Sequence, residues 1–415
     1  MTEENKPEIV TTMASRSSAV LVVFGFTIFL SAALLFSIQP LLGKMLLPLL
    51  GGAPAVWNTV MVFFQAMLLA GYAHSHYSFQ KFGLRKQPYL QIVLVLGAVL
   101  LLPFPTPGHD ALSTKLAPSF WVIVTLFKTV ALPVFVLAST APLLQKWFAS
   151  SRHPSAKDPY FLYSASNLGS FGSLFAYPLL MEPLLTIHEQ RTWWTRFFWI
   201  YSGFIVLCVL LTRKFEAVPE VEEHSKIEKS APISTYTKLK WIGLSFVPSS
   251  LMLGVTNYIT TDVASIPLLW VVPLALYLFT FVVAFGNPSK TIQQASARAV
   301  PILALALTFP MLVQATEPVI VLVLLHLFFF FFATLRCHLR LANSRPSSAH
   351  LTQFYLYLAL GGAMGGVFNA LVAPAVFDSI LEYPLMIMVA TLIGFPERSD
   401  KKPKSPFRPC TAAPW

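Results

Sequence analysis

The sequence predicts an all-α integral membrane protein with about twelve transmembrane helices in two six-helix halves. Three observations predict this fold class. Of the 415 residues, 55% are hydrophobic and only 11% are charged, so a water-soluble surface could not be built from them. Apolar runs of about 20 residues, the length that crosses a bilayer, recur along the chain. The loops between these runs alternate in charge, as loops on opposite sides of a membrane do.

The first predicted half covers residues 20–212 and follows a polar N-terminal tail, residues 1–19. Its first apolar run is a retained span and not a secretory signal, because Glu3, Glu4 and Glu8 dilute the basic charge before it and more spans follow. The six spans expected here are Val20–Ile38, Ala55–Ala73, Tyr89–Leu102, Phe120–Ala138, Tyr160–Leu180 and Phe197–Leu211.

A polar segment, residues 213–240, separates the halves. It mixes both charge signs with Pro219 and few apolar residues, so we expect a linker that cannot fold alone. The second half covers residues 241–395, and a basic, proline-rich tail occupies 396–415. The spans expected in the second half are Trp241–Val255, Ile266–Phe285, Ala299–Val313, Val319–Leu335, Phe354–Leu371 and Ile380–Ile393.

Loop charge predicts the orientation in the membrane. One set of loops collects basic residues, including Lys81, Arg85, Lys146 and Arg345, together with the lysines of the linker. The opposite set has few basic residues and holds seven carboxylates: Asp110, Glu182, Glu189, Asp262, Glu317, Asp378 and Glu382. The positive-inside rule places the first set, the linker and both termini in the cytoplasm. We therefore expect a multi-pass protein of the cell (inner) membrane with lipid around it.

An internal repeat supports the division into halves. A shift of 194 positions superimposes Phe161-Leu162-Tyr163 on Tyr355-Leu356-Tyr357, and Gly172 on Gly366. Each copy follows a basic loop, so the two units have the same orientation. Parallel six-span repeats resemble the two halves of major facilitator transporters.

Glycine clusters occur in two of the predicted spans. Gly361, Gly362, Gly365 and Gly366 lie on an apolar helix with no preceding strand, so they indicate close helix packing and not a nucleotide loop. Gly169 and Gly172 have the same interpretation in the fifth span, where Asn167 offers an interhelical hydrogen bond; ligand contact is the alternative.

Two apolar stretches rich in helix breakers suggest a solute pathway, because irregular backbone at membrane depth lines a cavity or lies at the interface. The first surrounds residues 39–58 and presents Gln39, Lys44 and Asn58, with Gln65 on the next span; the second contains Asp262. Pairs of tight extracellular turns with interfacial anchors are the alternative interpretation.

Few residues point to other chemistry. Lys128 lies inside the fourth span, where it either pairs functionally or extends to the headgroups, and we include it among the pathway candidates. His326 is a titratable candidate or a hydrogen-bonded packing residue. The three cysteines and the pair His74 and His76 lack metal-ligand spacing, so we predict no metal. The net charge of +11 is spread over loops beside spans, which excludes a nucleic-acid surface.

A family resemblance covers most of positions 20–390. The stretches that carry it are FSIQPLLGKMLLPLLGGAPAVWNTVMVFFQAMLLAGYAHSHY, ASTAPLLQKWF, DPYFLYSASNLGS, VPSSLMLGVTNYITTD, IPLLWVVPLALYLFTF and LTQFYLYLALGGAMGGVFNALVAP. They resemble the membrane region of bacterial fused major facilitator/spermidine synthase-like proteins. The segment Cys337-His338-Leu339-Arg340 departs from the family pattern, which implies a small residue and an acid after the Cys-His pair.

The resemblance implies transport fused to polyamine chemistry. Members commonly continue into a soluble aminopropyltransferase-like domain with a nucleoside-binding sheet, and nothing similar follows Ile393 here. We therefore expect no catalytic residues, no cofactor and no aminopropyltransferase activity from these residues.

The function expected from the sequence is a secondary-transporter-like module for a small polar or charged solute, with a polyamine implied by the resemblance. A polyamine would favour Asp262, Glu182 and Glu317, whereas Lys44 would suit an anion. The alternatives are a non-catalytic membrane anchor or scaffold for a separately encoded spermidine synthase-like enzyme, and a truncated fragment of a fused membrane synthase.

Overall fold

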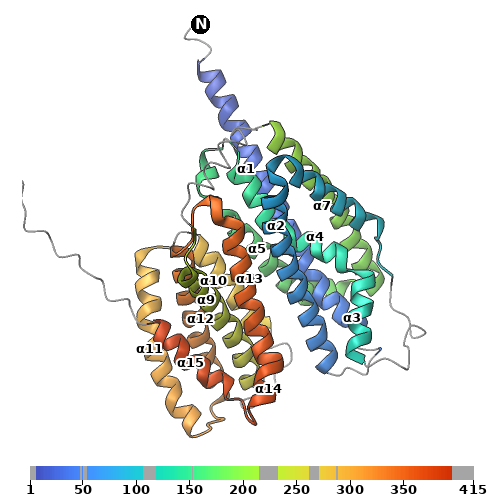
Figure 1. The fold of residues 1–415 in the computed structure, drawn as a ribbon. Helices are drawn as coiled ribbons and strands as arrows, with labels where there is room; N and C mark the ends of the chain where they lie inside the picture. Colours follow the sequence, from blue (N-terminus) through green and yellow to red (C-terminus); the bar gives the residue numbers. More distant parts are fainter. Residues whose placement is uncertain are drawn as a thin grey trace, which may run out of the picture.

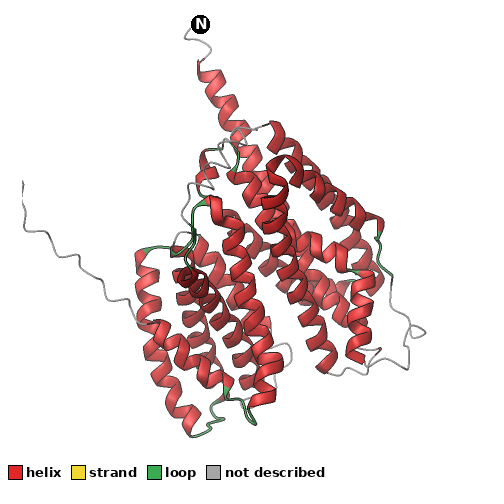
Figure 2. Cartoon of the chain, in the orientation of Figure 1, coloured by secondary structure: helices red, strands yellow, loops and turns green. Residues whose placement is uncertain are grey.

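The computed structural model confirms the predicted fold class. It describes residues 6–46, 49, 54–105, 118–151, 153–214, 232–260, 271–286 and 288–394, and this part of the chain contains helices and no β-strand (Figures 1 and 2). The helices from α1 to α7 lie beside those from α9 to α15 (Figure 1).

The first half contains six spans, but its helices do not correspond to them one to one. Gly83, at φ 60° and ψ −174°, interrupts α2. Ser75 and Gln91, one on each side of it, both hydrogen-bond Ser139, so α2 folds back into two adjacent spans. Only Val130 separates α3 from α4, and the two together form the fourth span. The elements are α1 (Lys6–Leu46), α2 (Pro54–Leu100), α3 (Pro118–Thr129), α4 (Ala131–Ala149), η4 (Pro154–Lys157), α5 (Phe161–Ala176), η5 (Tyr177–Met181), α6 (Glu182–Leu184) and α7 (Ile187–Lys214).

The second half repeats one irregularity of the first, in its fifth span. A π-helical turn, η8, interrupts its fifth span as η5 interrupts the fifth span of the first half, and Pro374 follows η8 as Pro183 follows η5. Proline cannot continue regular helical hydrogen bonding, which accounts for an irregular turn at both places. The elements are α9 (Thr235–Tyr258), α10 (Val271–Phe285), α11 (Lys290–Leu312), α12 (Val319–Asn343), η7 (Ser348–His350), α13 (Leu351–Val367), η8 (Phe368–Val372), α14 (Ala373–Val376) and α15 (Glu382–Gly394).

Length and composition support a membrane location. Six helices in the described ranges are long and apolar enough to cross a bilayer: Ala19–Leu46, Ala131–Ala149, Ile187–Thr212, Thr235–Tyr258, Lys290–Leu312 and Val319–Asn343. The most peripheral, α11, leaves Leu305, Phe309 and Leu312 exposed, as lipid contact requires. Each remaining predicted span also falls wholly or partly on helix.

The internal repeat exists, but its register differs from the predicted shift of 194. A Cβ added at Gly169 would meet the Phe29 backbone of α1, and one added at Gly361 would meet the Ile242 backbone of α9. These positions are 361 − 169 = 192 apart, which also matches Tyr163 to Tyr355. Two residues turn a helix by about 200°, so the predicted alignment paired opposite helix faces.

Close helix packing requires glycine at only some of the predicted packing positions. Gly169, Gly361 and Gly365 lie where a Cβ would meet backbone of the neighbouring helix. Gly172 and Gly362 are corrections to the prediction: a Cβ there would meet nothing within 4 Å, so close packing does not require glycine at either position.

Candidate functional site

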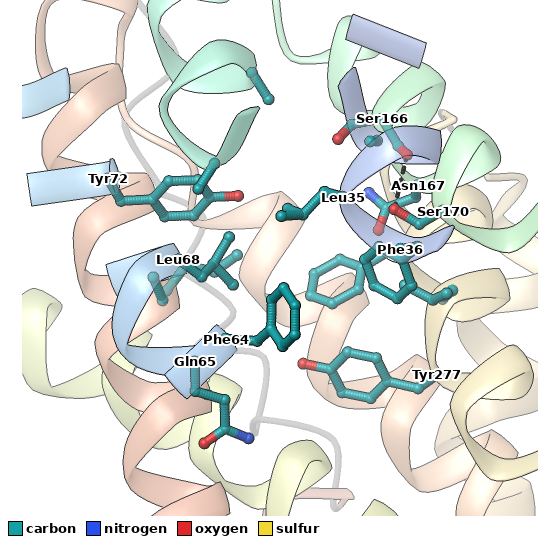
Figure 3. Close-up of a pocket in the computed structure, with 18 of the residues that line it drawn as sticks. Leu35, Phe36, Phe64, Gln65, Leu68, Tyr72, Ser166, Asn167, Ser170 and Tyr277 are labelled. Atoms are coloured by element: carbon teal, nitrogen blue, oxygen red, sulfur yellow. Dashed lines mark hydrogen bonds between the residues drawn. The ribbon is translucent and has the colours of Figure 1, made fainter. Parts of the chain in front are cut away.

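A cavity of about 210 Å³ lies between the two halves. Seven helices line it: α1, α2, α4 and α5 from the first half, and α9, α10 and α13 from the second. Figure 3 shows Tyr72 and Tyr277 extending their rings toward this space from opposite sides. The cavity is smaller than the ~300–1,000 Å³ of sites for drug-sized ligands, so it fits a small solute.

The described part of the lining is polar but uncharged. Aromatic rings and small apolar side chains form most of it, and none of the described residues in it is a lysine, arginine, aspartate or glutamate. The polar groups are Ser31, Gln39, Gln65, Tyr72, Tyr163, Ser166, Asn167, Ser170, Ser245, Ser249 and Tyr277. Hydroxyls and amides both donate and accept hydrogen bonds, so this wall can replace the water around a neutral polar molecule.

Local helix geometry fixes several of these groups. Asn167 Nδ2 donates to the Tyr163 carbonyl one turn earlier (2.8 Å), which holds the amide at the cavity wall. Ser249 Oγ donates across to the Gly362 carbonyl on α13 (2.8 Å). Gly365 lets α13 approach α9 closely. Both helices present small residues at this contact, and these small residues leave space between the halves.

An aromatic cluster closes the cavity toward the basic loops. We call it the aromatic seal and define it as Tyr72, Tyr160, Tyr163, Phe281, Phe285, Phe354 and Tyr355, all of which are buried. The rings of Tyr163 and Tyr355, one from each half, lie 4.9 Å apart between centroids, and Tyr163 also contacts Phe285 at 5.0 Å. These two tyrosines are related by the 192-residue repeat, so the seal is built from equivalent positions of the two halves.

Polar contacts reinforce the seal on its loop side, which we call the basic end. Tyr355 Oη donates to Gln145 Oε1 (2.7 Å), and Tyr160 Oη donates to the Pro346 carbonyl (2.9 Å). An ion pair joins Arg345 to Asp158 at 2.7 Å. Each of these contacts joins the first half to the second.

Contacts at the opposite end are mainly apolar or flexible. Leu174 of α5 packs against Val271, Ala275 and Leu278 of α10. Gly366 of α13 lies against the side-chain amide of Gln65. Within the described residues, the strongest polar links between the halves therefore lie at the basic end.

Some of the predicted pathway residues line the cavity and others do not. Gln39 and Gln65 line the cavity. Lys44 does not, since its Nζ pairs with Glu182 of the same half at 3.3 Å. Lys128 is exposed on α3, the position expected for a lysine that reaches the headgroups. Asp262 and the side chain of Asn58 lie outside the described residues.

Sequence reasoning missed the tyrosines and assigned Asn167 to packing. Tyr72, Tyr163 and Tyr277 supply aromatic faces and hydroxyls to the cavity or its closure. The internal repeat could have indicated Tyr163, because the shift of 192 positions places Tyr163 and Tyr355 at equivalent positions of the two halves. Tyrosine is common in lipid-facing and packing positions, so composition alone could not distinguish these residues.

The remaining titratable candidates serve packing in this structure. His326 Nδ1 lies 2.8 Å from Tyr383 Oη inside the second half, away from the cavity lining. Cys208 and Cys337 are buried free thiols. Within the described ranges, no three histidine, cysteine or acidic side chains gather as a metal site.

Comparisons with known proteins agree with this architecture. The xylose transporter XylE from E. coli matches at a TM-score of 0.54 and 15% identity, over 91% of this chain and 94% of that chain. The human organic anion transporter MFSD10 matches at 0.55 and 14%, over 91% and 99%. The POT family transporter PepTSo matches at 0.52 and 12%, over 90% and 96%. No protein-family model and no curated protein matches the sequence.

These similarities show the fold. At identities of 12–15%, the chain shares the two-half helical architecture of major facilitator transporters, as the sequence predicted. They carry no support for the resemblance to spermidine synthase fusions. Xylose and organic anions, the solutes named for two of these transporters, differ, so the choice of solute has to come from the cavity itself.

Proposed function

We propose that this protein is a secondary transporter for a small uncharged polar solute that binds in the cavity between its halves. The observation that carries the proposal is the lining: hydroxyls, amides and aromatic rings from both halves, with no charged side chain among the described residues that form it. A site shared by two similar halves can be exposed to either side of the membrane when the halves tilt.

Electrostatics favours an uncharged solute over a polyamine or an organic anion. A dehydrated ion without a countercharge costs several kcal/mol, and the lining residues that the structure describes offer no countercharge. A neutral solute loses only hydrogen bonds to water, which Asn167, Gln65 and the tyrosine hydroxyls can replace. The polyamine solute expected from the family resemblance therefore lacks support in the lining.

Counterflow in proteoliposomes tests the proposal. Labelled xylose, glycerol and inositol serve as uncharged probes, and spermidine and benzoate as charged ones. We expect exchange of at least one uncharged probe and of neither charged probe. Exchange confined to spermidine or benzoate would overturn the uncharged assignment. If none of the probes moves while the purified protein remains folded, the scaffold function replaces transport.

Matched variants connect flux to the cavity. Asn167→Ala and Tyr277→Phe remove single polar groups from the lining, and we expect each to reduce exchange at least fivefold. Lys128→Gln and Lys44→Gln change residues outside the lining, and we expect exchange within twofold of the parent. Equal losses in all four variants would show that the effect does not come from this cavity.

A further inference from the structure

A second cavity lies between the halves at the basic end. Its volume is about 250 Å³, and it is separate from the uncharged cavity. The charged or polar residues that line it include His76 and Lys146 from the first half, and Lys238, His350, Thr352 and Gln353 from the second. We call it the basic cavity. None of the described residues that line it is an aspartate or glutamate.

Two of its polar side chains, Lys146 and His76, are buried and held by hydrogen bonds. Lys146 is 3% exposed; its Nζ donates to the Ser348 carbonyl (3.3 Å) and lies 4.8 Å from the Phe79 ring centroid. His76 is also buried, with Nδ1 3.0 Å from Thr352 Oγ1. A buried ammonium group at a cavity wall is expensive unless it serves a binding role or a structural one.

Helix ends add to the positive potential. The first turn of α13, which begins at Leu351, contributes Thr352 and Gln353 to the cavity wall. The start of α9 also contributes to the cavity wall, through Ile233 just before the helix and Lys238 in its first turn. The N-terminus of a helix carries about half a positive charge, so two helix dipoles and two lysines act in the same direction.

We propose that the basic cavity binds a phosphate-type anion that bridges the two halves. Several oxygens on one phosphate group can accept hydrogen bonds from donors in both halves at once. Lys146 belongs to the first half and Lys238 to the second, so one bound anion would attract a cation of each half. Bound phosphate therefore stabilises the arrangement closed at the basic end. Both a soluble phosphate compound and the headgroup of an anionic lipid carry this chemistry.

Burial and the nearby His350 lower the pKa of His76, which lies beyond the predicted span Ala55–Ala73. A bound anion would raise the pKa of His76 and so oppose this shift.

Thermal unfolding of the full-length protein in detergent tests the site, with inorganic phosphate as the probe and chloride at equal ionic strength as the reference. We expect phosphate to raise the unfolding temperature saturably and chloride not to do so. Lys146→Gln should weaken the apparent affinity at least tenfold, and the double variant Lys238→Gln/His350→Gln at least threefold. The double variant keeps the test valid if the buried lysine is needed for folding.

Lys81→Gln is the matched control, since Lys81 is an exposed lysine of the same end that does not line the cavity. We expect its phosphate response to equal that of the parent. A parent protein that responds to neither phosphate nor phosphatidylglycerol overturns the proposal. So does a double variant that responds as the parent does.

Nanodiscs identify the source of the phosphate group. If a headgroup fills the site, replacing part of the phosphatidylcholine by phosphatidylglycerol should stabilise the parent and abolish the added effect of free phosphate. If a soluble compound fills it, free phosphate should stabilise the parent equally in both lipids. Under either outcome, the stabilisation must be weaker in the double variant Lys238→Gln/His350→Gln. Neither outcome depends on transport.

Discussion

Helix contacts inside each half differ from those between the halves. Inside the first half, α5 approaches α1 so closely at Gly169 that an added Cβ would meet the Phe29 backbone, and Gly361 repeats this contact with the Ile242 backbone in the second half. Between the halves, Gly366 approaches only the end of the Gln65 side chain. The other links between the halves in the described residues are apolar side-chain packing, ring contacts, hydrogen bonds and an exposed ion pair.

The difference indicates which parts of the molecule move as units. Backbone pressed against backbone cannot yield without separating two helices, so each half behaves as a rigid body. Side-chain tips can rotate, and hydrogen bonds can exchange with water. We therefore expect the interface between the halves to open and reform, as the proposed transport requires. Four predictions test this contrast, from the largest expected effect to the smallest.

The largest loss of stability should follow Gly169→Ala and Gly361→Ala, because the new methyl group meets backbone. Overpacking costs about 1–3 kcal/mol, occasionally more. Because the methyl group meets backbone that cannot rotate away, we expect a cost at the upper end of this range, above the roughly 1 kcal/mol that alanine gains over glycine in a helix. Thermal unfolding in detergent measures the change. Gly172→Ala and Gly362→Ala are controls in the same two helices and should not lower the unfolding temperature. Equal destabilisation in both pairs would contradict the rigid-half interpretation.

Tyr355→Phe should weaken the interface while keeping the ring of the aromatic seal. The variant removes the hydrogen bond to Gln145 Oε1, and the Nε2 atom of this buried side chain already has no partner among the described residues. Leaving a buried acceptor unsatisfied costs about 1–3 kcal/mol. A cysteine placed at Ala349 should react faster with an impermeant maleimide in this variant.

Tyr357→Phe is the control for that measurement. Tyr357 lies two residues further along α13 and contacts Trp241 of its own half, at 6.4 Å between ring centroids. Labelling at position 349 should be unchanged. Faster labelling in both variants would mean that the reaction does not report on the seal.

Gly366→Ala should have a smaller effect than Gly361→Ala, although both added methyl groups meet neighbours. The neighbour at Gly366 is the Gln65 amide, which can rotate away. We expect a change in unfolding free energy below about 1 kcal/mol. A loss as large as that of Gly361→Ala would show that the halves are locked together as firmly as the helices within them.

Asp158→Asn should have the smallest effect. Asp158 and Arg345 form an ion pair at 2.7 Å, with side chains 52% and 26% exposed. Exposed pairs contribute about 0–1 kcal/mol and are screened by salt. The variant should therefore match the parent protein in 0.5 M salt. A loss that persists in high salt would contradict a screened surface pair.

The sequence by itself determined the fold class and the number of spans. Apolar runs must form helices in lipid because every backbone polar group needs a partner, so hydropathy alone identifies them. It also indicated Gln39 and Gln65, because polar side chains beside helix breakers stand out in an apolar chain. The correspondence between the halves was visible as well, although matching Gly172 to Gly366 misplaced it by two residues.

Only the tertiary structure decided which polar groups share one space. The pairing of Lys44 with Glu182 depends on how α1 lies against α6, and the exposure of Lys128 depends on which face of α3 turns outward. Tyr72, Asn167 and Tyr277 come from three helices whose rotations are set by packing at small residues such as Gly71 and Gly169. A rotation of a few tens of degrees would move any of them out of the cavity, and sequence periodicity does not fix helix rotation that closely.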